Sequence, residues 1–292
     1  MFRQLGLVGC GLMGGSFALA MKKAGLVDQV VGYSASDATS ERAQRLGVID
    51  ARAPSAGDAV ANADLVLIAV PVAATGSALE AIRPRIADGT LIMDVGSTKR
   101  DVVTVARPAL AQHIGHFVPA HPIAGKELAG VEHADAMLYA GRQVILTPTQ
   151  DTYASRVEQA RQLWTALGCQ VRLMSPEAHD AAFAAVSHLP HLLAFALMNA
   201  IGNQPDAPAF LSLAGPGFRD FTRIAASDPA VWRDILIANK EEVLAQTRHF
   251  RQALEALETA IGSDRRDALQ AMIDAASTTR AHWRMTAAEP RH

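Results

Sequence analysis

Leu5-Gly6-Leu7-Val8-Gly9-Cys10-Gly11-Leu12-Met13-Gly14-Gly15-Ser16 begins as an apolar strand and runs directly into a glycine-rich turn. Gly9, Gly11 and Gly14 fit the spacing G-x-G-x-x-G. In that spacing the first glycine permits a tight turn, the second lets a pyrophosphate approach the backbone, and the third lets the helix pack against the strand. The stretch predicts a dinucleotide-binding unit with Leu12 and Met13 in its loop. The alternative is a glycine-rich turn that binds no ligand.

Outward from this stretch, short apolar runs alternate with amphipathic helical patterns over the first half of the chain. Such alternation is typical of a parallel sheet covered by helices. Strands are expected at residues 5–8, 29–33, 65–70, 90–94, 116–119, 143–147 and 170–173. Helices are expected at residues 14–24, 39–46, 73–86, 99–113 and 151–167. We predict an α/β fold whose first domain, residues 1–174, is a Rossmann-like doubly wound sheet, with Pro148 as the alternative boundary.

The pattern changes at Ser175, where long Ala- and Leu-rich helical stretches replace the strand patterns. Ser175-Pro176-Glu177 has the composition of a helix start, with serine as the N-cap and proline in the first turn. Pro190 is expected to kink or interrupt the helix that follows. The second domain, residues 175–292, is therefore predicted to be all α.

Composition narrows the classes of partner. The 292 residues carry 27 Lys and Arg against 29 Asp and Glu, a formal net charge of -2, without long basic runs. Nucleic-acid binding needs clustered Lys and Arg, so a small molecule is the expected partner. Two cysteines are too few for a disulfide framework and fit a reducing cytoplasm. We expect no targeting segment and no membrane partner, because no apolar run reaches transmembrane length.

The end of the second expected strand bears on the choice between NAD and NADP. NAD-binding domains usually carry an acidic residue there for the ribose 2′-hydroxyl, and Ser34 occupies that position. A serine would not repel a 2′-phosphate, so the sequence leans slightly to NADP. Ser36 belongs to the same turn, and Asp37 could still reach the ribose. Val70 and Pro71 are expected to form a wall that faces the cofactor.

Two polar stretches are candidates for the chemistry. Pro119-Ala-His121-Pro-Ile-Ala-Gly125-Lys-Glu127 is expected to hold a histidine in a loop, where it could accept a proton near neutral pH. Asp94-Val-Gly-Ser97-Thr-Lys99 follows an expected strand, at the edge where open α/β sheets bind ligands. Ser97 could equally be the N-cap of a helix that starts at Lys99.

Three more stretches follow in the second half: Ser187-His188-Leu-Pro-His191, Gly215-Pro-Gly217-Phe-Arg219-Asp-Phe-Thr-Arg223 and Trp232-Arg-Asp-Ile235. In content and order, all five stretches together resemble the prephenate/arogenate dehydrogenase family of tyrosine biosynthesis. The resemblance spans nearly the whole chain. It implies an NAD- or NADP-dependent oxidative decarboxylation of prephenate to 4-hydroxyphenylpyruvate. It also implies dimerisation through the helical domain, giving a homodimer.

The resemblance assigns roles to matching positions. It implies that His121 accepts the proton of the C4 hydroxyl, and that Ser97 hydrogen-bonds His121 or that hydroxyl. Arg223 matches the arginine for the ring carboxylate, and a guanidinium suits bidentate capture of that group. The carboxylate of the substrate side chain is assigned to Arg219 and His191, with His188 as a further candidate. Trp232 matches a tryptophan that can reach a neighbouring subunit's site.

Alternatives stay open at the level of sequence. His188 and His191 could form half of a metal site, but we expect no metal, since hydride transfer needs none. The substrate could be arogenate, although His191 favours prephenate. A β-hydroxyacid dehydrogenase would use a lysine base, for which Lys240 is the candidate. A protein that senses NAD(P) without turnover would not need His121, Ser97 and Arg223 together.

Overall fold

The computed structural model describes residues 1–125 and 128–284, so Lys126 and Glu127 of the His121 stretch lie outside the described residues. The opening stretch forms strand β1 (Phe2–Val8) and helix α1 (Leu12–Lys23). Leu5, Leu7 and Val8 are buried, which explains the continuous apolar run of a strand covered on both faces. The predicted strand, turn and helix are confirmed.

Six parallel strands form the main sheet in the order β3-β2-β1-β4-β5-β6. The strand order reverses between β1 and β4, so the switch point lies where the glycine turn leaves β1. Two apolar clusters lie on the sheet, one containing Phe17 and Trp164 and the other Leu79 and Val102. The remaining strands are β2 (Val27–Tyr33), β3 (Ala51–Arg52), β4 (Leu65–Ile68), β5 (Leu91–Asp94) and β6 (Phe117–Val118). The remaining helices of this half are α2 (Asp37–Arg45), α3 (Ala56–Val60), α4 (Thr75–Ile82), α5 (Arg100–Leu110) and α6 (Ala154–Ala166).

A second, three-stranded sheet consists of β7 (Ala120–Pro122), β8 (Gln143–Leu146) and β9 (Gln170–Leu173). Strand β7 is antiparallel to β8, and His121 lies opposite Ile145. The expectation that His121 lies in a loop was therefore wrong. Three residues ending in a proline are too short to produce an alternating pattern, so the sequence carries no strand signal there.

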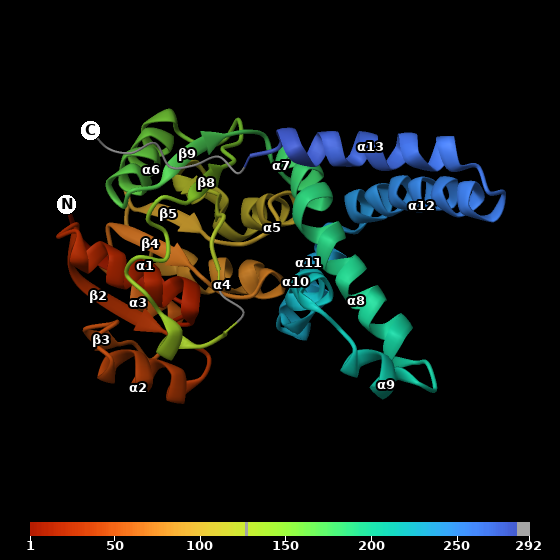
Figure 1. Ribbon diagram of the computed structural model, residues 1–292. Helices are drawn as coiled ribbons and strands as arrows, with labels where there is room; N and C mark the ends of the chain where they lie inside the picture. Colours follow the sequence, from red (N-terminus) through yellow and green to blue (C-terminus); the bar gives the residue numbers. More distant parts are fainter. Residues whose placement is uncertain (126–127, 285–292) are drawn as a thin grey trace, which may run out of the picture.

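The second half is helical, as predicted, and its helices project away from the sheet (Figure 1). Ser175 caps α7 (Pro176–Phe183) by accepting a hydrogen bond from the N–H of Ala178 at 3.1 Å. Ahead of Pro190 the chain widens into a π-helix, Ala184–His188, before α8 (Leu189–Gly202) begins. The other helices are α9 (Ala207–Ser212), α10 (Pro216–Thr222), α11 (Pro229–Ala238), α12 (Lys240–Gly262) and α13 (Arg266–His282).

One helical run, Pro176–Gly202, is long and apolar enough to span a membrane by length and composition, with 17% of its apolar window buried. The expectation that no apolar run has this length was wrong, because the helix continues through Pro190 where the sequence suggested a break. Length and composition are weak evidence when one helix meets them. An exposed apolar helix that stands out from the sheet (Figure 1) also suits an interface between two chains.

Candidate functional site

A cavity of about 540 Å³ lies at the carboxyl end of β1, at the switch point of the sheet. Its walls come from the glycine turn, from the end of β2 and from the segment after β4. These are the three places where a dinucleotide is bound in a doubly wound sheet. Of the predicted cofactor residues, the lining contains Gly9, Gly11, Ser34, Val70 and Pro71.

The three glycines meet three different steric demands. Gly9 has φ +102°, and a Cβ there would lie 2.3 Å from the carbonyl oxygen of Ala69. A Cβ at Gly14 would lie 2.1 Å from the carbonyl oxygen of Gly9. At Gly11 a Cβ would meet no atom within 4 Å, which leaves room for a pyrophosphate in front of the N-terminus of α1. The turn therefore fits the phosphates of a dinucleotide.

Four predicted cofactor residues lie outside the lining of the cavity, namely Gly14, described above, and Leu12, Met13 and Ser36. Leu12 and Met13 pack against the core, and the carbonyl of Met13 accepts a hydrogen bond from the hydroxyl of Tyr139 at 2.7 Å. Ser36 is the N-cap of α2, with its hydroxyl 3.4 Å from the N–H of Thr39. Their side chains pack and cap, and the expectation that these residues bind the cofactor stays a prediction.

The end of β2 is close to a cation that the sequence did not suggest. Arg52 of β3 pairs in register with Gly32 and forms ion pairs with Glu41, at 3.1 Å, and with Asp37, at 3.7 Å. The side chain of Asp37 is 95% exposed, and its ion pair links the start of α2 to β3. Eighteen residues separate Arg52 from the end of β2, so the sequence alone does not indicate that the two are close. The parallel pairing of β2 with β3 brings them together.

A chain of hydrogen bonds leads away from His121. Its Nδ1 lies 2.8 Å from Nε2 of His179, and Nδ1 of His179 lies 2.7 Å from Oδ1 of Asp180. Phe183 stacks on the ring of His179 with 4.4 Å between centroids. His179 and Asp180 are adjacent in the first turns of α7, so both domains contribute to the chain. Neither His179 nor Asp180 was predicted from the sequence.

The chain determines the tautomer of His121. Ionised Asp180 can only accept, so Nδ1 of His179 carries a proton and its Nε2 accepts the proton on Nδ1 of His121. Nε2 of His121 then presents a lone pair. It has no hydrogen-bond partner among the residues that the structure describes. The arrangement presents a neutral imidazole as a proton acceptor.

The pKa shifts agree with this protonation pattern. Burial lowers the pKa of His121 well below its ordinary value, and His179, Lys99 and His188 lower it further. Burial also lowers the pKa of His179, against a smaller opposing effect of Asp180. Burial alone would raise the pKa of Asp180, but hydrogen bonds from His179 and from two backbone N–H groups hold it below its ordinary value.

Helix α5 is capped from the other domain. It begins at Arg100, and the N–H groups of Lys99 and Arg100 donate to the two carboxylate oxygens of Asp180 at 2.8 and 2.9 Å. Ser97 is half-buried and supplies no cap, so the N-cap alternative for Ser97 was wrong. A hydrogen bond from Ser97 to His121 was also expected, but the partner of Nδ1 of His121 is His179.

His191 and His188 differ in their surroundings. Nδ1 of His191 lies 2.9 Å from the carbonyl oxygen of Ser187, and the ring stacks on Trp232 with 3.5 Å between centroids. His188 is 1% exposed and its Nδ1 lies 3.1 Å from Nδ2 of Asn239. His191 is thus half-open to a ligand, whereas His188 is packed as a buried helix histidine, which was the simpler alternative.

Trp232 stacks on His191 of its own chain, and its reach to a neighbouring subunit stays a prediction. Its helix α11 packs against the turn Val72–Ala74, which directly follows the cavity wall at Pro71. The helical domain therefore brings His191 and Trp232 to the side of the cofactor cavity.

Both predicted arginines lie at the surface of the helical half. Arg219 is 75% exposed in α10 and pairs with Asp220 at 3.1 Å. Arg223 is exposed at the start of the turn Arg223–Ala226, which packs on α8. The helix that carries His191 thus positions the turn of Arg223.

Two other candidate sites received no support from the geometry. Lys240 is exposed at the first position of α12, and the chain of His121 does not include it. Within residues 1–125 and 128–284, no three His, Cys, Asp or Glu side chains are grouped to hold a metal ion.

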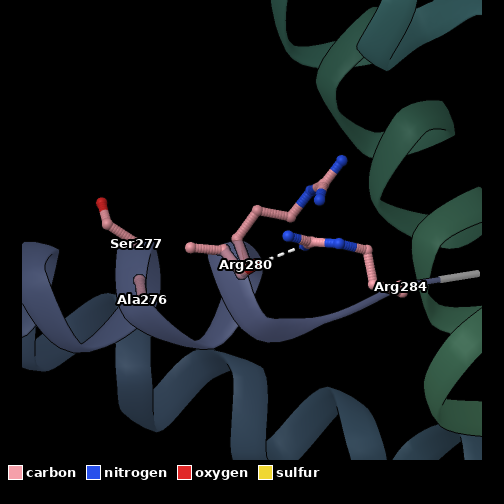
Figure 2. A pocket seen from close by; sticks show the side chains of 5 residues that line it. Ala276, Ser277, Arg280 and Arg284 are labelled. Carbon is pink, nitrogen blue, oxygen red and sulfur yellow. Dashed lines mark hydrogen bonds between the residues drawn. The ribbon is translucent and has the colours of Figure 1, made fainter.

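A separate hollow at the end of α13 is lined by small side chains and by Arg280 and Arg284 (Figure 2), and shares no residue with the cofactor cavity.

Comparison with known proteins gives one consistent family. Residues 17–173 match the family model described as prephenate dehydrogenase, nucleotide-binding domain, and residues 175–275 match prephenate dehydrogenase, dimerization domain. The chain is 36% identical to a cyclohexadienyl dehydrogenase of Zymomonas mobilis, with 92% of each chain covered. It is 40% identical to a prephenate dehydrogenase of Bacillus subtilis, over 87% of this chain and 68% of the relative.

A solved structure agrees with these relatives. The prephenate dehydrogenase of Aquifex aeolicus, determined in complex with hydroxyphenyl propionate and NAD+, superposes with a TM-score of 0.89. The two sequences are 35% identical, and the superposition covers 96% of this chain and 98% of the other.

Proposed function

The chain belongs to the prephenate dehydrogenase family, and from that premise we propose that it converts prephenate to 4-hydroxyphenylpyruvate by NAD(P)-dependent oxidative decarboxylation. The observation that carries the proposal is the lone pair on Nε2 of His121, held there by His179 and Asp180. His121 follows Ala120, whose N–H is bonded to Asp94 at the carboxyl end of β5. The glycine turn leaves β1 at the same edge of the main sheet, which is where such sheets bind their ligands.

The reaction divides between the cofactor and the chain. When bound at the glycine turn, the oxidised nicotinamide would supply the acceptor for the hydride of C4. His121 takes the proton of the C4 hydroxyl as the hydride leaves, which requires a neutral ring within hydrogen-bond reach. The bond from C1 to the carboxylate then breaks, CO2 departs, and its electron pair completes the aromatic ring. The proton on His121 returns to the phenolate oxygen, so the proton balance closes.

Arg223 binds the ring carboxylate in this proposal, and Arg219 and His191 serve the side chain of the substrate. The exposed guanidinium groups of the two arginines can form charge-assisted hydrogen bonds with carboxylates. Ser97 lies in the bend after β5 and hydrogen-bonds the C4 hydroxyl there. Trp232 supports the ring of His191 by stacking.

A second candidate substrate, arogenate, is favoured by one detail of His191. Its Nδ1 donates to the carbonyl of Ser187, so the Nε2 of the neutral ring is an acceptor. Burial lowers the pKa of His191, although the bond to Ser187 opposes that effect. A neutral acceptor suits the ammonium of arogenate, whereas the keto acid of prephenate lacks a donor. The cyclohexadienyl dehydrogenase relative makes this alternative concrete.

One experiment tests the function and the two choices together. Rates of nicotinamide reduction and CO2 release are measured for prephenate and for arogenate, each with NAD+ and with NADP+. Prephenate is expected to give the higher kcat/KM and to release one CO2 per reduced nicotinamide. The absence of turnover with both substrates would contradict the proposed function.

The same experiment tests a preference for NADP+. Ser34 gives the cavity an uncharged side chain where a carboxylate would repel a 2′-phosphate. Asp37 forms an ion pair with Arg52 and does not line the cavity. A higher kcat/KM with NAD+ would contradict this preference.

The active form in this proposal is a homodimer in the cytoplasm. Apolar side chains stay exposed on the helical half of a single chain, among them Leu213 at 85%, Ile237 at 68% and Ile261 at 61%. Apolar surface of this extent favours burial against a second copy. Light scattering at micromolar concentration should give twice the mass of one chain. The free, buried Cys10 and Cys169 fit a reducing compartment.

A further inference from the structure

A fully buried ion pair lies behind His121, and the mechanism above uses neither of its members. Lys99 is 0% exposed and Asp94 is 1% exposed, with Nζ and Oδ2 2.5 Å apart. Removing two charges from water is costly, and a buried pair is by itself weak evidence for stability. The role of the pair is therefore indicated by the groups that its two side chains hydrogen-bond.

The pair holds both polar backbone groups of Ala120, the residue before His121. The N–H of Ala120 donates to Oδ1 of Asp94 at 3.0 Å, and its carbonyl accepts from Nζ of Lys99 at 2.8 Å. Strand β7 has β8 as its neighbour on one side. The two side chains satisfy Ala120 in place of a second strand, and they tie β7 to the carboxyl end of β5.

Lys99 also belongs to the hydrogen-bond chain of His121 through its backbone. Its N–H donates to Oδ1 of Asp180, the oxygen that also bonds His179. These bonds form a closed ring that begins and ends at Lys99. Its ammonium bonds the carbonyl of Ala120, the residue before His121; the imidazole of His121 bonds His179; His179 bonds Asp180; and Asp180 bonds the N–H of Lys99. The imidazole is thus held both through its main chain and through its Nδ1.

We propose that the buried pair of Lys99 and Asp94 is a positioning device for the proton acceptor, which fixes His121 by its backbone and acts on kcat without contributing to substrate or cofactor affinity. The proposal rests on the role of His121 in the proposed function. Lys99 and Asp94 are positioning residues, because their side chains are buried under β7 and have no exposed surface to offer a ligand. A misplacement of about 1 Å in a reacting group can cost about 100-fold in rate.

The test replaces both charges at once, because removal of one alone would strand the other in the interior. The double variant Asp94→Asn with Lys99→Met removes the donor to Ala120. Asp94→Asn with Lys99→Gln restores an uncharged donor near the same position. The matched control is Lys22→Met with Asp50→Asn, which removes another lysine–aspartate pair, at 2.6 Å, whose aspartate also accepts a strand N–H, that of Val30, at 2.7 Å.

Turnover of prephenate is measured per mole of cofactor-binding protein, so that loss of folded protein alone leaves kcat unchanged. For the Met double variant we expect kcat to fall by about 10- to 100-fold, with KM and the cofactor Kd within about threefold of wild type. The Gln double variant should recover part of the loss, and the Lys22 and Asp50 control should keep its kcat. An unchanged kcat in the Met variant would overturn the proposal.

A second readout is independent of activity. Nitrogen-15 NMR of the histidine rings reports tautomer and protonation. In wild type we expect His121 to be neutral with its proton on Nδ1. Burial lowers the pKa of His121, and His179, Lys99 and His188, which belong to three segments, lower it further. The Met double variant should show mixed tautomers and a titration at higher pH, and wild-type signals there would overturn the proposal. If wild type itself fails to turn over prephenate, the proposed function fails while this readout still tests the ring.

Discussion

His188 should make the stability of the protein strongly dependent on pH. It is 1% exposed, and burial lowers its pKa from 6.5 to about 4, with His179 and His191 lowering it and Asp180 opposing them. Its Nδ1 accepts from the side-chain amide of Asn239 at 3.1 Å, a bond that a protonated ring cannot accept. Protonation is therefore penalised in the folded state only.

The sign and size follow from linkage. Because the folded pKa lies below the unfolded one, the unfolded state binds more protons between pH 6.5 and about pH 4, and stability falls as the pH drops through that window. A shift of this size is worth about 3 kcal/mol when complete. Between pH 7 and pH 5 the contribution of His188 is about 2 kcal/mol.

The perturbation is His188→Asn, because the asparagine oxygen can replace Nδ1 as an acceptor for Asn239 without titrating. Urea unfolding is followed by tryptophan fluorescence at pH 7 and pH 5, at one protomer concentration. The variant should lose about 2 kcal/mol less than wild type between the two pH values. His249→Asn, at an exposed position of α12, controls for the replacement itself. An equal loss in wild type and in the His188 variant would refute the reasoning.

Four further substitutions test the site. Gly9→Ala should lower the free energy of unfolding by about 1–3 kcal/mol and abolish cofactor binding, since its Cβ would lie 2.3 Å from a carbonyl oxygen at φ +102°. Gly11→Ala should keep the free energy of unfolding and lose only affinity for the cofactor. Urea unfolding and cofactor titration measure the two effects, and any other result would contradict the steric reasoning. Asp180→Ala should reduce kcat by about 10²- to 10⁴-fold with little change in KM, because the tautomer of His121 is no longer fixed; wild-type turnover in steady-state assays would contradict the hydrogen-bond chain. Arg223→Ala should raise the KM for prephenate by about 10- to 100-fold, the value of a charge-assisted hydrogen bond; a loss of folded protein at unchanged KM would argue for a structural role.

The sequence predicted what local patterns encode. The glycine spacing after β1 predicted the cofactor cavity, because the three glycines of the pattern lie within one short turn of the sequence. The start of α7 at Ser175 was predicted for the same reason, since an N-cap is a local interaction. The positions of β1, β2, β4, β5 and β6 followed from their apolar runs, whereas the two-residue strand β3 was not predicted.

What the sequence did not predict depends on contacts between distant segments. Asp180 caps α5 across the domain boundary, 80 residues from Arg100, and no pattern around either residue announces that bond. His179 was missed because one more histidine in a helix is unremarkable until the fold brings it to 2.8 Å from His121. The strand that carries His121 was missed because its pairing partner, β8, lies more than twenty residues later.

The most direct test of the account is the steady-state turnover of prephenate by wild type and by His121→Asn. Wild type should reduce one NAD(P)+ for each CO2 released. The variant should lose about 10²- to 10⁴-fold in kcat, the value of a positioned general base, while its cofactor Kd stays within about twofold of wild type. Undiminished turnover in the variant would contradict the assignment of His121 as the proton acceptor.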